Sequence, residues 1–195
     1  MEREARREQI LEGLATESDR GCILVGASAL DGLLEEVLRT ALIASSHAVK
    51  YAVAPLFEPM GPMATFSAKI KLAYGLGLIS MDCFTDLEKI RRIRNVAAHE
   101  FSPMSFESQE IIEITRTLEG ADHAVRSFRD KSLDTRPRTG TLKPQAKISK
   151  ERMRFILTVS HIGGSLDGTC EMLSSSQNVK KDKVQKVSDR RSTTT

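Results

Sequence analysis

Apolar residues recur every three to four positions through most of the chain, which is the period of an α-helix that turns one face toward a core. The longest series predicts a helix over 19–45, and Ser18 or Asp19 can cap its first turn. Shorter series predict helices over 2–15, 66–76, 81–98, 106–129 and 148–175. No alternating β-branched run stands outside a helical period. The sequence therefore predicts an all-α fold, a compact multi-helix bundle.

Proline and glycine mark the expected breaks between these helices. Three prolines and a glycine lie within 55–62 and predict an ordered loop over 47–63, because proline lacks an amide donor and clashes with the preceding turn. The pair Gly163 and Gly164 is expected to kink or split the last helix. Gly21 and Gly26, within the longest helix, are expected to allow another helix to approach closely.

The pattern suggests one helical domain followed by a tail. The domain is expected to span 1–175, with its core in 17–129, a basic linker over 130–147 and the last helix over 148–175. Residues 176–195 are polar and basic and show no apolar period, so we expect a disordered C-terminal tail there.

The net charge of +3 hides a division between the two halves of the chain. Residues 1–125 hold 13 Lys or Arg and 19 Asp or Glu, whereas residues 126–195 hold 16 and 7. A basic segment attracts phosphates, nucleic acid or acidic protein surfaces, although a solvated linker is the alternative. The candidate contacts are Arg136, Arg138, Lys143, Lys147, Lys150 and Arg152.

Several classes of protein are disfavoured by what the sequence lacks. Its three cysteines are far apart and predict reduced thiols, and no apolar run has the length of a signal peptide or a membrane span, so we expect a cytoplasmic protein. The nucleotide-binding, zinc-protease and serine-hydrolase motifs are absent, and no cofactor is expected. No two of the four histidines have helical spacing, so a metal site would have to be assembled across helices, and none is assigned.

The densest polar cluster lies at the end of the helix predicted over 81–98. Arg94, Asn95 and His99 can converge there, since His99 lies one turn beyond Asn95. An arginine that stabilises a phosphorane and a histidine that moves a proton are the parts of a metal-independent ribonuclease. The alternative is structural, with these side chains closing the helix and pairing with neighbouring carboxylates.

Three segments resemble the mannitol operon repressor family (MltR). They are ESDRGCILVGASALDGLLEEVLR, LFEPMGPMATFSAKIKLAYGLGLIS and FTDLEKIRRIRNVAAHEF, within 17–101. The resemblance implies a compact all-helical repressor of a sugar-alcohol operon without a recognisable helix-turn-helix. Such a regulator would act through a protein partner or through a non-standard contact with DNA. Broad apolar helix faces make a homodimer the expected assembly.

The same sequence offers a second functional hypothesis. The RNxxAH segment at Arg94 is similar to the short motif of the HEPN superfamily, and that resemblance implies an endoribonuclease or RNA-binding subunit that uses Arg94 and His99. The repressor signature also includes polar residues that could form a binding cluster or pair between helices. These candidates are Glu17, Asp19, Arg20, Lys69 and Arg91.

Overall fold

The computed structural model describes residues 10, 12–42, 46–99, 104–132 and 148–192. These residues form helices joined by turns, and none of them lies in a strand. In chain order the elements are α2 (Asp19–Leu42), α3 (Ser46–Ala48), the π-helix η1 (Val49–Val53), α4 (Ala54–Leu56), α5 (Phe66–Gly75), α6 (Met81–His99), α7 (Gln109–Thr115), α8 (Gly120–Ser132) and α9 (Lys150–Ser192). The predicted all-α bundle is confirmed.

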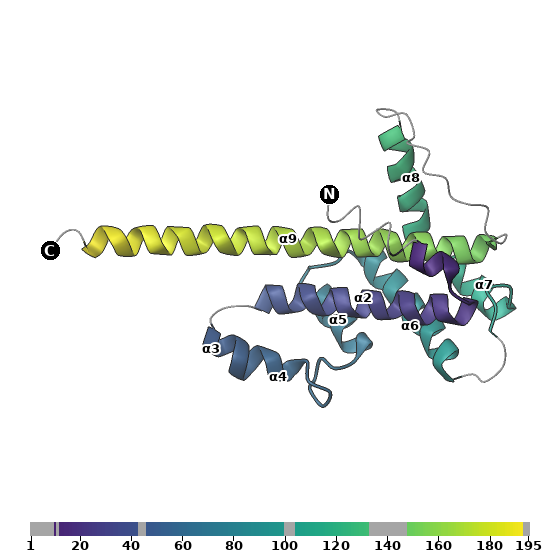
Figure 1. Ribbon diagram of the computed structural model, residues 1–195, viewed down its shortest axis with the longest axis horizontal. Helices are drawn as coiled ribbons and strands as arrows, with labels where there is room; N and C mark the ends of the chain where they lie inside the picture. Colours follow the sequence, from purple (N-terminus) through teal and green to yellow (C-terminus); the bar gives the residue numbers. More distant parts are fainter. Residues whose placement is uncertain (1–9, 11, 43–45, 100–103, 133–147, 193–195) are drawn as a thin grey trace.

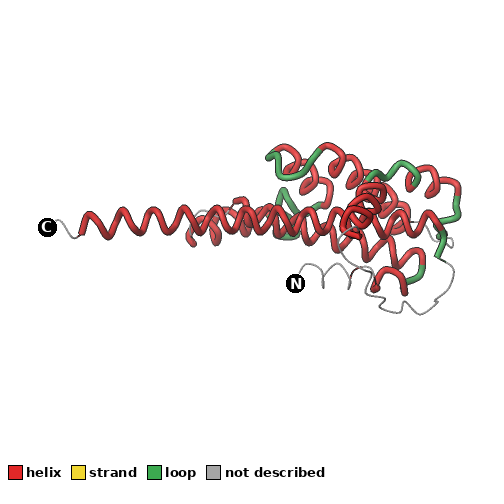
Figure 2. The backbone as a smooth tube through the Cα atoms, turned by 90° about the horizontal axis from the view of Figure 1, so that it is seen from above, coloured by secondary structure: helices red, strands yellow, loops and turns green. Residues whose placement is uncertain are grey.

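Helix α9 organises the molecule, because it runs along the whole bundle and beyond it (Figure 1). Helix α2 lies alongside the first part of α9, and α8 stands steeply across it (Figure 1). Helices α5 and α6 pack against α2 from another side. In the view from above, the second half of α9 extends away from the other elements (Figure 2). The bundle is therefore built around the pair formed by α2 and α9.

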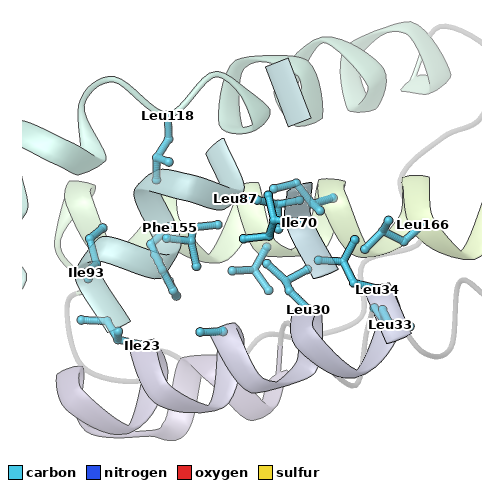
Figure 3. Packing of buried hydrophobic residues seen from close by; sticks show 14 of the residues in the cluster. Ile23, Leu30, Leu33, Leu34, Ile70, Leu87, Ile93, Leu118, Phe155 and Leu166 are labelled. Carbon is cyan, nitrogen blue, oxygen red and sulfur yellow. The ribbon is translucent and has the colours of Figure 1, made fainter. Parts of the chain in front are cut away.

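The core fills the space between α2, α5, α6 and α9 (Figure 3). Leu30 and Leu34 of α2, Ile70 of α5, Leu87 of α6 and Phe155 of α9 all meet there and have no exposed surface. Burying a large apolar side chain contributes about 1.5–3 kcal/mol. The helical spacing of these positions in the sequence is thus explained by one shared core.

The contact between α2 and α9 depends on a small residue. A Cβ placed on Gly26 would lie 3.0 Å from Cε1 of Phe155, which is tighter than ordinary packing. The expectation of close helix approach is confirmed at Gly26. It is wrong at Gly21, where a Cβ would meet Glu17 and Ser18 of the preceding turn and not another helix. Phe155 also contacts Phe106, with the two ring centroids 5.5 Å apart, so this aromatic pair joins α9 to the segment before α7.

Two sequence-based boundaries are wrong. The loop expected over 47–63 is helical as far as Leu56, where α3, η1 and α4 follow one another directly and Pro55 lies at the start of α4. The helix expected over 106–129 is two helices, α7 and α8, separated by residues 116–119. A carboxylate from α6 accepts the amide protons at that break, as described below.

The remaining boundaries are close to expectation, with one extension. Helices α2 and α6 begin at the expected residues. The last helix is not split at Gly163 and Gly164, contrary to expectation, because α9 is helical through both. It also continues to Ser192, through the segment expected to form the tail. Of the helix expected over 2–15, the described residues 10 and 12–16 are helical. Most of the basic linker lies outside the described residues.

The turn before α5 requires a glycine. A Cβ on Gly61 would overlap the carbonyl oxygens of Pro55 and Leu56, and those oxygens belong to the backbone and cannot move aside cheaply. We expect Gly61→Ala to lower the free energy of unfolding by about 1–3 kcal/mol. Gly75→Ala is the matched control, since a Cβ there meets nothing within 4 Å. Chemical denaturation measures both, and an equal effect of the two variants would contradict this account of the turn.

Candidate functional site

Arg94, Asn95 and His99 lie together on the last turns of α6. Arg94 and His99 are exposed and Asn95 is half-buried. Nη1 of Arg94 is 3.4 Å from Oδ1 of Asn95, a long hydrogen bond between neighbouring residues. A pocket lined in part by Asp82 lies at the opposite end of this helix. At a rise of 1.5 Å per residue, Asp82 is about 25 Å from His99 along the helix axis. The sequence thus located the trio correctly on one helix, but the structure does not place it in this pocket.

Asp19, at the start of α2, joins three segments. Its Oδ1 is 3.1 Å from Nη1 of Arg152 on α9, and its Oδ2 accepts the amide proton of Phe106 at 3.0 Å. Arg152 also donates to the backbone carbonyls of Leu14, Ala15 and Glu17. This largely buried guanidinium therefore connects α9 to the beginning of α2 and to the helical turn before it.

Lys69 pairs with carboxylates on another helix. Its side chain is 6% exposed, and Nζ lies 2.9 Å from Oδ1 of Asp31 and 2.8 Å from Oε2 of Glu35. Glu35 also binds Arg39, one turn further along α2. Burial opposes the charge on Lys69, but its interactions with the acceptors Glu35 and Asp31 outweigh burial and raise the Lys69 pKa. Lys69 therefore binds α5 to α2.

The same network predicts an acid-sensitive contribution to stability. Burial of Glu35 opposes its charge, yet the hydrogen bonds from Lys69 and Arg39 outweigh burial and lower its pKa below 4.5. A carboxylate whose pKa is lower in the folded than in the unfolded state stabilises the fold at pH values above its unfolded-state pKa. That stability is lost as the pH falls through the folded-state pKa. We expect Glu35→Gln to be less stable than wild type at neutral pH and to lose less stability on acidification. Urea denaturation at a series of pH values measures this, with Glu58→Gln, an exposed carboxylate, as control. Parallel curves for Glu35→Gln and wild type would contradict it.

The five polar residues of the repressor signature are spread over three helices and the turn before α2. Arg91 binds Glu88 on its own helix, with Nη2 and Oε2 2.8 Å apart. Glu17 is exposed, and Arg20 is half-buried near the start of α2. Asp19, Lys69 and Arg91 are therefore in separate ion pairs, and the pairs made by Asp19 and Lys69 join different helices.

The basic segment contributes little exposed charge among its described candidates. Lys150 is exposed at the start of α9, whereas the Arg152 side chain is only 13% exposed in its ion pair. Arg136, Arg138, Lys143 and Lys147 lie outside the described residues.

Arg154, a neighbour on α9 that the sequence did not single out, is also held within the fold. It donates to the carbonyls of Thr115 and Leu118 and to the carboxylate of Asp122. Its hydrogen bond is the main cause of a lowered Asp122 pKa. Two arginines at the start of α9 thus hold this end of the bundle together.

A polar pocket of about 130 Å³, which the sequence did not reveal, lies where α6 and α8 begin. Beside it, Asp86 is 2% exposed and accepts the amide protons of Glu119 and Gly120 at 3.0 and 2.7 Å. Lys89 approaches the same carboxylate at 3.4 Å. Asp86 therefore caps α8 from another helix, which explains why the chain breaks there into two helices.

The three cysteines are free thiols, as expected. Burial raises the pKa of Cys22 to about 11, and burial together with Asp86 and Asp82 raises that of Cys83 to about 12. At neutral pH both are protonated and poor nucleophiles. Neither thiol is therefore suited to covalent catalysis in this state.

Comparison with known proteins identifies the family. Residues 6–160 match the model of the family described as MtlR, mannitol repressor. Curated mannitol operon repressors from Escherichia coli K12 and from E. coli O6:H1 are each 38% identical over 66 residues. The match spans 34% of this chain and 34% of each relative.

Solved structures share the fold. The X-ray structure of the MtlR–HPr complex from E. coli aligns with a TM-score of 0.61 at 22% identity, covering 83% of this chain and 98% of that one. A possible transcriptional regulator, YggD, from Shigella flexneri 2a aligns with a TM-score of 0.58 at 13% identity, covering 86% and 97%. Among the described residues, no helix is long and apolar enough to cross a membrane. Because the family model covers most of the sequence, the chain belongs to the mannitol repressor family, MtlR.

Proposed function

We propose that the protein is a transcriptional repressor of a sugar-alcohol operon that acts in the cytoplasm through a protein partner. Its membership of the mannitol repressor family carries this proposal. The E. coli family member whose fold it shares was solved in complex with HPr, so an HPr-type protein is the partner we infer.

The placement of the basic residues supports a partner rather than direct reading of an operator. Base recognition requires Arg, Asn or Gln side chains on an element that enters the major groove. Arg152 and Arg154 of α9 are instead held by carboxylates and backbone carbonyls of the same chain. Lys150 remains exposed, but a single lysine supplies mainly sequence-independent attraction to phosphate.

The ribonuclease hypothesis is not favoured. It depended on the short RNxxAH resemblance, whereas the family match extends over residues 6–160. Arg94 and His99 are exposed at the end of α6. A regulator needs neither side chain for chemistry, so both can serve as ordinary surface residues.

Calorimetric titration with HPr from the same organism tests the proposal. We expect saturable binding with a Kd of about 1 µM or tighter, which corresponds to a binding free energy of about 8 kcal/mol. A duplex carrying the sugar-alcohol promoter is the comparison ligand, and we expect only weak binding that disappears as salt is raised. Light scattering on the same samples gives the mass of the free protein, for which we propose a homodimer. Absence of HPr binding together with salt-resistant, promoter-specific DNA binding would overturn the proposal.

A further inference from the structure

The pocket where α6 and α8 begin is lined by carboxylate and imidazole side chains, which are types that bind transition metals. It opens where the first turns of α6 and α8 approach α9, and its walls include Asp82, His123 and His161. These residues come from three different helices. The sequence alone could not bring them together, since no two histidines have helical spacing.

Three potential ligands converge beside the pocket. One carboxylate oxygen from each of Asp82 and Glu119 and one ring nitrogen of His123 all lie within 4.8 Å of one another. Nε2 of His123 is 3.9 Å from Oδ2 of Asp82. The side chains of His123 and Asp82 are 40% and 59% exposed, so both can adjust their rotamers and an ion can enter from solvent.

We propose that Asp82, Glu119 and His123 form a binding site for a divalent transition-metal ion of the zinc class. Imidazole nitrogen and carboxylate oxygen are common zinc ligands, with bonds of about 2.0–2.2 Å. A tetrahedral ion with such bonds brings its ligand atoms to about 3.3–3.6 Å from one another. The three donor atoms therefore need to move by only about 1 Å, which rotation of exposed side chains supplies.

The local charge favours a cation. Asp82, Asp86 and Glu119 place three carboxylates around this end of the bundle, and Lys89 is the lysine that approaches Asp86. Asp86 is already occupied by the amide protons of Glu119 and Gly120, so it stabilises the start of α8. Asp82 and Glu119 supply two negative charges, which balance the charge of a divalent ion.

A second histidine packs against His123. The His123 and His161 rings stack with their centroids 5.5 Å apart and an angle of 13° between their planes. A stacked neighbour restricts the rotation of the His123 ring, so less side-chain freedom is lost when the imidazole binds an ion. His161 of α9 therefore packs beside the proposed ligand, and the bound ion itself joins α6 to α8.

Titration of the metal-free protein with Zn²⁺ tests the proposal, which is independent of the proposed repressor function. We expect one equivalent to bind, and the melting temperature to rise by roughly 5–10 °C at 100 times the Kd. Asp82→Asn and His123→Ala should each weaken binding at least tenfold, while circular dichroism confirms that both variants fold. His47→Ala is the matched control, because it removes an exposed imidazole from α3 and should leave affinity unchanged.

Mg²⁺ provides the second comparison. Magnesium prefers oxygen ligands and retains its waters, so we expect no stabilisation at concentrations at which Zn²⁺ saturates. Equal binding of both ions would overturn the assignment, because it would indicate carboxylates acting without the imidazole. Undiminished Zn²⁺ affinity in both site variants, or no saturable binding to the wild type, would also overturn it.

Discussion

Replacing Phe155 with alanine is expected to lower the free energy of unfolding by about 3–5 kcal/mol. The side chain has no exposed surface, contacts Phe106 and lies against Gly26, so its removal leaves a cavity at the contact between α2 and α9. For a protein of this size the melting temperature should fall by roughly 6–20 °C. Thermal and urea unfolding of the purified variant provide the measurement.

Met153→Ala is the control for this change, since Met153 lies two residues earlier on α9 and is 41% exposed. An exposed substitution of this kind changes stability by about 0.5 kcal/mol or less. If Phe155→Ala were no more destabilising than Met153→Ala, the pair formed by α2 and α9 would not be the centre of the fold.

Asp86→Ala is expected to destabilise the protein by about 2–4 kcal/mol. The carboxylate is 2% exposed and accepts the amide protons of Glu119 and Gly120 at the start of α8, so its loss leaves buried donors without their acceptor. Lys89 loses its carboxylate neighbour as well. Denaturation in urea measures the total effect, and hydrogen exchange should show the largest loss of protection at the start of α8.

Two further variants distinguish the loss of the hydrogen bonds that cap α8 from the loss of a carboxylate charge on α6. Asp86→Asn keeps an acceptor oxygen of the same shape, so we expect a smaller loss than for Asp86→Ala. Asp82→Asn changes a carboxylate on the same helix that is 59% exposed, and in the presence of a chelator it should be nearly neutral. Equal effects of Asp82→Asn and Asp86→Ala would contradict the proposed role of Asp86.

Helices with a continuous apolar face were predictable from the sequence. Helix α2 was expected over 19–45 and spans Asp19–Leu42, and α6 was expected over 81–98 and spans Met81–His99. In both, local capping and periodicity agree with the tertiary packing. The break between α7 and α8 was not predictable, because the group that caps α8 is Asp86, more than thirty residues earlier in the chain.

Candidate site residues, too, could be grouped from the sequence only where they lie on the same helix. Arg94, Asn95 and His99 were expected on one helix, and all three lie on α6. Asp82 and His123 were not grouped, because they meet only after α6 and α8 pack together. The roles of Asp19 and Lys69 were open at the level of sequence, and the structure places each in an ion pair between helices. Local spacing therefore identified residues within a helix, whereas contacts between helices required the fold.

The most direct test of repression is the transcript level of the sugar-alcohol operon in cells with and without the protein. Our account predicts that deletion raises the transcript, that the wild-type gene restores repression, and that Arg94→Ala/His99→Ala restores it equally well. The same cells should show an unchanged decay rate of the transcript, because repression acts on synthesis. Loss of repression in the double variant, accompanied by slower decay of the transcript, would contradict the account and favour RNA cleavage by Arg94 and His99.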